Sequence, residues 1–424
     1  MPLLSSVPPD ITPLAISPPY RRLWTGLTIS AFGQQMALVA ISFEAYHLTG
    51  DSFAVGLVGL FGLVPLVLGG LYGGVLVDAF DRRTVALLSA LGLWACSLAL
   101  VVHAVAGGER VEVLYAIVAV QAAMFAINSP ARSAMLPRLL PPQVLPAANA
   151  LSTASFTLSF TVGSLLGGVL IGWGGVTAVY AVDAALFTAA IYSLVRLPPI
   201  PAGEKAPVPG LRSVVDGLGF LRAAPNLRAS FVLDLCAMVL AQPRAAFPAL
   251  AATVYLAGGH GDEGAWVLGV LQAAPALGSF VAFCVSGWLG RVHRHGLAIV
   301  VAIMAYGVAV GLAGFAAVGL PGVLWLGVAL LALSGSADMV SSAYRSTMLQ
   351  TAAPDELRGR MQGVFTVVVA GGPRLGDVVM GSLASLVGEG QAMMLGGALC
   401  LAAVGLVVLT ARRFLDYDAR APMP

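Results

Sequence analysis

Long apolar runs alternate with short polar segments along the whole chain. A helix needs about 20 apolar residues to cross the hydrocarbon core of a bilayer, and the runs reach that length. The pattern predicts an all-α integral membrane protein with twelve transmembrane helices, at approximately 23–47, 53–78, 84–106, 112–136, 147–172, 175–197, 227–256, 264–290, 296–318, 322–350, 361–387 and 390–411.

The longest polar segment, 198–226, divides the twelve runs six and six. Its first half is rich in proline, and its second half is basic and half-apolar, which is typical of a helix lying on a membrane surface. A plain solvated linker is the alternative. We expect a cytoplasmic N-terminal tail, a six-helix bundle, a cytoplasmic linker with an amphipathic helix, a second six-helix bundle and a cytoplasmic C-terminal tail, at 1–22, 23–197, 198–226, 227–411 and 412–424.

The two predicted bundles repeat each other at a constant shift of 213 residues. Because each bundle holds an even number of helices, both have the same orientation and a pseudo-twofold axis runs along the membrane normal. The shift places Ser129, Arg132, Met135, Gly163 and Gly168 on Ser342, Arg345, Met348, Gly376 and Gly381.

Composition and charge exclude a soluble domain. Hydrophobic residues make up 58% of the chain and charged residues 10%, with a mean hydropathy of +0.91, whereas soluble domains carry about 25% charged residues. Basic residues collect in alternate connections, and the opposite connections hold only Arg110. Since cytoplasmic loops hold the arginines and lysines, we expect both termini in the cytoplasm, the lipid bilayer as the surroundings and no nucleic-acid partner.

The turn between the second and third runs carries a motif that reads approximately G-x-L-a-D-r-x-G-r-r. The residues that fit it are Gly74, Leu76, Asp78, Arg82 and Arg83, and Asp81 stands where the second glycine is usual. On this motif the chain resembles the major facilitator superfamily. The resemblance implies the major facilitator fold, in which two pseudo-symmetric six-helix bundles enclose a central path.

Three stretches are similar to the enterobactin-exporter and macrolide-efflux subgroup of that superfamily, at 128–151, 244–251 and 341–354. The resemblance implies a proton-coupled exporter of the bacterial inner membrane, with a siderophore-like cargo or a drug-like one as in multidrug and macrolide resistance. Residues 163–168 keep the glycines of the drug-exporter antiporter motif but place Ser164 where proline is usual. The export direction therefore rests on the overall similarity.

The motif residues are expected to gate the cytoplasmic end through charge-assisted bonds from the Asp78 carboxylate. A positive-inside anchor with an aspartate that caps the next helix is the alternative. Two arginines near the inner ends of helices 4 and 10 are expected to partner the gate, or to snorkel. The predicted gate comprises Gly74, Asp78, Arg82, Arg83, Arg132 and Arg345.

Charged side chains inside apolar runs are costly and usually face a cavity or a partner. Proton-coupled export needs a carboxylate whose protonation is exchanged for cargo, and Asp377 and Asp338 are the first choices. Asp234 and Glu44 lie nearer helix ends, where we expect water to reach them more easily. Asp183 is a weaker choice, because helix 6 of this fold stands toward the periphery.

Cargo is expected to meet a cation and several amides. Arg244 suits an anionic or catechol-bearing molecule, with helix packing as the alternative, and Arg374 could instead form an ion pair with Asp377. Amides in membrane helices commonly bond to neighbouring helices. The substrate-binding candidates are Arg244, Arg374, Gln34, Gln35, Gln121, Asn128 and Gln272.

The sequence has no phosphate-binding loop, zinc-type spacing or hydrolase elbow, so we expect no enzyme, no metal and no cofactor, with the proton gradient as the energy source. A monomer is expected, and outer-membrane or periplasmic export components stay open as partners. An importer or uniporter of a small metabolite on the same fold is the nearest alternative. A membrane receptor or scaffold that does not transport is a more distant one.

Overall fold

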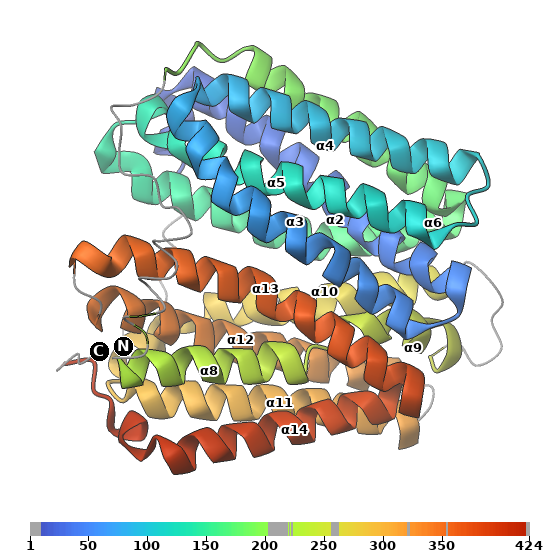
Figure 1. Cartoon of the computed structure of the whole chain (residues 1–424), viewed down its shortest axis with the longest axis vertical. Coiled ribbons are helices and arrows are strands. Elements are labelled where there is room, and N and C mark those ends of the chain that lie inside the picture. The colour runs from blue at the N-terminus through green and yellow to red at the C-terminus, as the bar shows by residue number, and fades with distance from the viewer. Residues whose placement is uncertain are drawn as a thin grey trace.

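The computed structural model in Figure 1 describes residues 10–201, 219, 221, 224–255, 263–319, 323–352 and 355–420, and most of them are helical. The helices are α1 (Thr12–Ile16), α2 (Pro18–Thr49), α3 (Ser52–Ala79), α4 (Arg82–Val105), α5 (Val111–Leu139), α6 (Leu145–Val195), α8 (Pro225–Leu240), α9 (Phe247–Thr253), α10 (Glu263–Cys284), α11 (His295–Gly319), α12 (Leu324–Ala352), α13 (Asp355–Val387) and α14 (Glu389–Thr410), with short 3₁₀ segments η1 (Pro142–Val144), η2 (Arg244–Ala246), η3 (Ser286–Arg291) and η4 (Arg412–Asp416).

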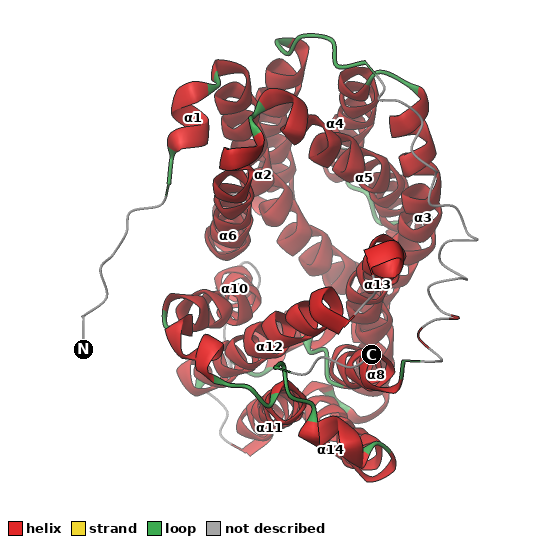
Figure 2. Ribbon diagram, turned by 90° about the vertical axis from the view of Figure 1, so that its left-hand side faces the viewer, coloured by secondary structure: helices red, strands yellow, loops and turns green. Residues whose placement is uncertain are grey.

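The long helices form two groups. The first group holds α2–α6 and the second holds α8–α14, and Figure 2 looks along both of them. Within the described residues, α3 contacts α13 and α6 contacts α10 across the junction. We call the end with the turn at 50–51 the α2–α3 end, and the end with the turn at 80–81 the α3–α4 end.

Ten helical stretches among the described residues are long and apolar enough to cross a membrane. One of them, Pro142–Val195, contains two helices, because the backbone leaves the helical region at Gly174 and Gly175. Gly175 has φ 67°, which glycine adopts without steric cost. The predicted break between 172 and 175 is thus confirmed.

Helix α13 is not among the ten. It carries the charged residues Arg374 and Asp377. It packs beside α3 and is longer, with 33 residues compared with 28 in α3. The all-α membrane architecture is confirmed, while the count of twelve spans stays a prediction.

Three predicted segments have features that the sequence did not indicate. The run 227–256 is interrupted, since α8 ends at Leu240 and Pro243 precedes η2; proline lacks the N–H that a continuous helix needs. The predicted tail 1–22 is helical from Thr12, and Ser17 caps α2. Phe414 and Tyr417 of the predicted tail 412–424 are buried.

The predicted amphipathic helix in 198–226 lies mostly outside the described residues. That interpretation therefore stays a prediction.

Glycines at repeated positions make equivalent contacts in the two groups. A side chain at Gly163 would collide with α2, and one at Gly376 would collide with α8, the first long helix of each group. Gly168 and Gly381 lie on the other face of the same helices, where a side chain would collide across the junction, with α10 and α3 respectively. The 213-residue repeat is therefore also a repeat of packing contacts.

Candidate functional site

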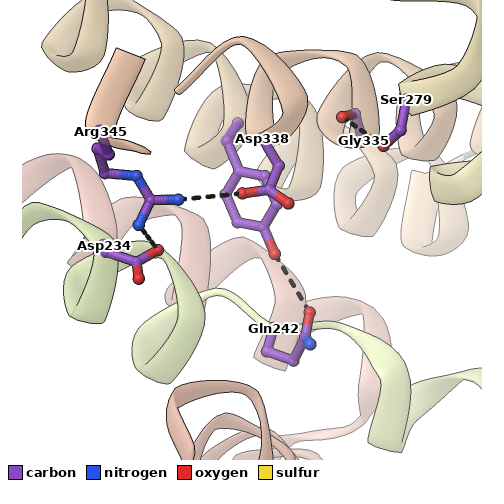
Figure 3. A network of polar contacts seen from close by, with 7 residues as sticks. Asp234, Gln242, Ser279, Gly335, Asp338 and Arg345 are labelled. Atoms are coloured by element: carbon purple, nitrogen blue, oxygen red, sulfur yellow. Dashed lines mark hydrogen bonds and ion pairs between the residues drawn. The ribbon is translucent and has the colours of Figure 1, made fainter. Parts of the chain in front are cut away.

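A buried arginine joins two carboxylates inside the second group. The Arg345 guanidinium contacts the Asp234 carboxylate through Nη1, and its Nη2 lies 3.7 Å from Oδ1 of Asp338. Figure 3 shows Arg345 between the two aspartates. The side chains of Arg345 and Asp234 are 5% and 4% exposed, whereas that of Asp338 is 40% exposed. We call these three residues the Arg345 cluster.

Helix geometry explains how the cluster assembles. Asp338 and Arg345 are seven residues apart on α12, so they lie about two turns apart on one face. Asp234 comes from α8, which packs against α12. The sequence placed Asp234 where water reaches it more easily. This prediction is wrong, because α12 and its arginine cover the Asp234 side chain.

Two polar residues beside the cluster were missed by the sequence analysis. The Tyr306 hydroxyl, from α11, lies 3.3 Å from Oε1 of Gln242 and 3.3 Å from the Ala241 carbonyl oxygen. Gln242 occupies the break between α8 and η2, and Figure 3 shows it close to the Arg345 cluster. The pair Gln242–Pro243 inside an apolar run was the signal that could have indicated this break.

Arg374 and Asp377 of α13 face the first group. Arg374 donates to the Gly62 carbonyl oxygen of α3 at 2.7 Å, and Asp377 packs against Gly56 and Gly59 of the same helix. Oδ1 of Asp377 is buried and has no hydrogen-bond partner among the described residues. The ion pairs within 4.0 Å in the described part of the chain do not include Arg374 with Asp377, so both side chains serve the contact with α3.

Arg244 also lies at the junction of the two groups. It belongs to η2 of the second group, and its guanidinium carbon lies 5.4 Å from the ring centroid of Phe160, on α6 of the first group. A cation over an aromatic face is attracted by the ring. The η2 segment that carries Arg244 contacts both α3 and α13, so Arg244 lies beside the α3–α13 contact.

Two arginines of the predicted gate, Arg82 and Arg83, bind backbone oxygens within the first group, whereas its Arg345 belongs to the Arg345 cluster. Arg82 Nη1 donates to the Ala134 carbonyl at 3.1 Å. Arg83 donates to the carbonyls of Leu194 and Val195, at 3.0 Å and 2.6 Å. Cations are favourable at a helix C-terminus, so Arg83 stabilises the end of α6.

Asp81, the departure from the family motif, proves to be a helix cap. Its Oδ1 accepts from the Thr84 backbone N–H at 2.8 Å, and its Oδ2 accepts from the Ile200 backbone N–H at 2.7 Å. The sequence left open that an aspartate of this turn caps the next helix, and in the structure the capping aspartate is Asp81. Gly74 and Asp78 lie in α3, but their side-chain surroundings fall outside the described part of the structure. Arg132 is half-buried on α5, and its role in a gate stays a prediction.

The amide candidates have different surroundings. Asn128 is buried, and its Nδ2 donates to the Ala86 carbonyl and to the Ser89 hydroxyl of α4, both at 2.9 Å. Those bonds favour the alternative of interhelical bonding. Gln272 is buried on α10, and Gln34, Gln35 and Gln121 are half-buried on α2 and α5.

Two carboxylates of the first group are more buried than the sequence indicated. Glu44 is only 6% exposed, because Tyr180 and His103 pack against it. Asp183 is fully buried and accepts a hydrogen bond from the Ser97 hydroxyl at 2.6 Å. The prediction that water reaches Glu44 more easily is therefore wrong. The peripheral position of helix 6, on which the weaker ranking of Asp183 depends, stays a prediction. Polar residues three apart in an apolar run, Tyr180 and Asp183, were the signal for a shared buried face.

Comparisons with known proteins agree with this architecture. A model of the transmembrane secretion effector family matches residues 10–423. The chain is 27% identical over 413 residues to the enterobactin exporter EntS of Shigella boydii, a match that covers 96% of this chain and 95% of that protein.

Solved structures show the same fold. The peptide transporter POT in complex with sulfate has a TM-score of 0.72 at 12% identity, covering 95% of this chain and 96% of that one. A bacterial homologue of the iron transporter ferroportin, in its inward-facing state, has a TM-score of 0.67 at 17% identity, covering 94% and 99%. With the family model matching nearly the whole chain, the protein belongs to the transmembrane secretion effector family and is a multi-pass transporter of the major facilitator superfamily, not an enzyme.

Proposed function

We propose that this transporter exports a small amphipathic molecule, siderophore-like or drug-like, across the bacterial inner membrane by proton antiport and alternating access. The observation that carries the proposal is the Arg345 cluster, in which two carboxylates share one guanidinium. With both carboxylates ionised, the cluster holds one negative charge in excess. One proton neutralises that excess, so the cluster has the stoichiometry of a single-proton site.

Exposure distinguishes the roles of the two carboxylates. Asp234 has almost no contact with solvent, whereas the Asp338 side chain is 40% exposed. A proton-exchanging group must meet water in at least one conformation, so we assign the proton to Asp338. Asp234 then acts as the permanent counter-ion that keeps Arg345 charged and in place.

The position of the close contacts supports alternating access. Gly56, Gly59 and Gly381 bring α3 and α13 together near the α2–α3 end, and Gly168 and Gly269 do the same for α6 and α10. We infer that this end is closed and faces the periplasm, with both termini at the cytoplasmic side. Rocking of the two groups about these glycine contacts would open it.

The residues at the junction suit an anionic aromatic cargo. Arg244 offers a cation beside the Phe160 ring, across the junction of the two groups. A catecholate ring could stack on the Arg244 guanidinium beside or in place of the Phe160 ring, while its oxygens accept hydrogen bonds from the guanidinium. The relative EntS is an enterobactin exporter, which supports a catechol-bearing siderophore as the first cargo to test.

An accumulation assay tests the direction and the cargo. Cells that synthesise enterobactin but lack an exporter for it would receive the gene, an empty vector, or the variant Arg244→Gln. Export predicts less intracellular enterobactin with the gene and a return toward the empty-vector amount with Arg244→Gln.

Exposed Arg413 provides the control variant Arg413→Gln, which should export normally. A higher intracellular amount with the gene would instead support an importer. An unchanged amount for enterobactin and for a macrolide, with the protein present in the membrane, would contradict the proposed cargo classes.

A further inference from the structure

A second cluster of titratable side chains is buried within the first group of helices, α2–α6. Glu44 on α2 accepts a hydrogen bond from the Tyr180 hydroxyl of α6 at 2.6 Å. The other carboxylate oxygen of Glu44 lies 3.5 Å from Nε2 of His103, on α4. All three side chains are buried. Three helices thus meet at one carboxylate, far along the chain from the Arg345 cluster.

The charges that act on Glu44 come from two helices. His103 belongs to α4, and His47 lies one turn from Glu44 on α2, stacked on Phe43 with a centroid distance of 5.8 Å. From α6, Tyr180 contacts Glu44 directly, and Asp183 acts electrostatically on Tyr180. The ion pair of Glu44 in the described part of the chain is with His103 and involves neither an arginine nor a lysine, so a proton is the charge available there to neutralise it.

The burial of Glu44 determines whether its carboxylate can stay ionised. An ionised carboxylate away from water is costly unless a cation or hydrogen bonds compensate it. The Tyr180 hydroxyl compensates one oxygen, whereas His103 Nε2 is close to the other oxygen but makes no hydrogen bond among the described residues. A proton from water, bound either to the carboxylate or to the imidazole, makes the Glu44–His103 pair neutral in total.

A short turn separates the Glu44, His103 and Tyr180 side chains from solvent. The turn 106–110 closes over His103, whose carbonyl oxygen accepts from the Gly108 backbone N–H at 2.9 Å. A side chain at Gly108 would collide with the His103 ring, so glycine lets the turn pack directly on the imidazole. Connecting turns lie at the protein surface, which provides a short route for protons from the α2–α3 end.

We propose that Glu44, His103 and Tyr180 form a proton-binding site at the α2–α3 end of the first group. Glu44 and His103 share the proton, and Tyr180 orients the carboxylate. Proton binding here does not depend on what the transporter carries; only a contribution of this site to coupling rests on the proposed function. The transporter then holds one proton site in each group of helices.

Infrared difference spectroscopy tests the site on the full-length protein in lipid nanodiscs. Spectra recorded between acid and alkaline buffers would show the band of a protonated carboxyl group. Glu44→Gln should remove a component of this band that titrates in the wild type, while Glu112→Gln, which alters an exposed carboxylate of α5, should leave it unchanged. A band that Glu44→Gln does not alter would overturn the site.

The partner variants test the sharing of the proton. Tyr180→Phe keeps the ring and removes the hydroxyl that stabilises the ionised carboxylate, so the midpoint of the Glu44 band should move to higher pH. His103→Gln should also shift this midpoint, and an unshifted midpoint in both variants would contradict the three-residue site. A variant that fails to fold is recognised by its thermal unfolding profile, and the remaining variants still decide the question.

The outcomes separate this site from the proposed function. Export that proves independent of protons would defeat the proposed antiport but leave the Glu44 band in place. Loss of the Glu44 assignment with intact proton-coupled export would defeat this site alone.

Discussion

At the residue scale, the Arg345 cluster shows how a membrane protein keeps a buried charge. Arg345 is the only described basic residue within 4.0 Å of Asp234 or Asp338. Its loss would leave the Asp234 carboxylate in a nearly dry site without a cation. Removal of one partner from a buried ion pair costs about 3–5 kcal/mol.

We therefore expect Arg345→Met to lower the free energy of unfolding by about 3–5 kcal/mol. Asp338→Asn should cost about 1 kcal/mol or less, because that carboxylate is partly exposed and farther from the guanidinium. Thermal and denaturant unfolding in detergent would measure both.

The variant Arg413→Met, at an exposed site of the C-terminal segment, is the matched control. Equal small losses for Arg345→Met and Arg413→Met would show that the buried ion pairs do not stabilise the second group.

Asn128 provides a second test at this scale. Its two hydrogen bonds join α5 to α4, so Asn128→Ala should destabilise the protein by about 1–3 kcal/mol and leave enterobactin binding unchanged. Tryptophan fluorescence can follow both unfolding and ligand binding. Weaker binding at unchanged stability would instead make Asn128 a cargo ligand, and Gln121→Ala, on the same helix, is the comparison.

The sequence predicted which buried charges matter but not which of them meet. Asp234, Asp338 and Arg345 stand out because each interrupts an apolar run. Their contact depends on how α8 packs on α12, which no local pattern encodes. Glu44 was misjudged for the same reason, since Tyr180 and His103 cover it from helices far away in the chain.

At the element scale, Asp81 links the start of α4 to the segment after α6. Replacing an N-cap aspartate with alanine costs about 0.5–2 kcal/mol, and Asp81→Ala also removes the bond to the Ile200 N–H. We expect a loss of stability in that range or slightly above it. Asp81→Asn keeps an acceptor for the cap and should cost less; equal losses in both variants would contradict the capping role.

The contact between α6 and α10 determines how closely the two groups of helices pack. A side chain at Gly168 would meet backbone atoms of Ala265 and Gly269, which cannot move aside without shifting a helix. Overpacking typically costs about 1–3 kcal/mol, so Gly168→Ala should shift the ratio of closed to open α2–α3 ends by roughly 5–150-fold.

Spin labels at Trp173 and Leu386, both strongly exposed near that end, would measure the shift by electron–electron distance after the native cysteines are replaced. Gly405→Ala on α14, where no neighbouring atom lies within 4 Å, is the control. An unchanged distance distribution for Gly168→Ala would contradict a closed contact at this place.

Span limits were predictable because hydrophobicity and length decide them. The interruption of the seventh span was not predicted, since one proline in an apolar run is compatible with either a kink or a break. The structure resolves it as a break at 241–246 that places Gln242 and Arg244 on non-α-helical backbone. Neither residue therefore follows the helical spacing that the predicted run 227–256 implied.

At the scale of the whole molecule, the repeat explains the arrangement of the junction. Gly168 and Gly381 occupy equivalent positions, and each brings its helix against the other group. The 213-residue shift predicted this symmetry from sequence alone. It could not predict the asymmetry in function, because the Arg345 cluster occurs in the second group and the Glu44 site in the first.

Proton-coupled export can be measured most directly in inside-out membrane vesicles that contain the protein. With an acidic lumen, enterobactin should accumulate inside the vesicles, and a protonophore should abolish the accumulation. Asp338→Asn should lose this dependence on the gradient while the protein stays folded. Enterobactin accumulation that continues unchanged after the proton gradient is collapsed would contradict proton antiport.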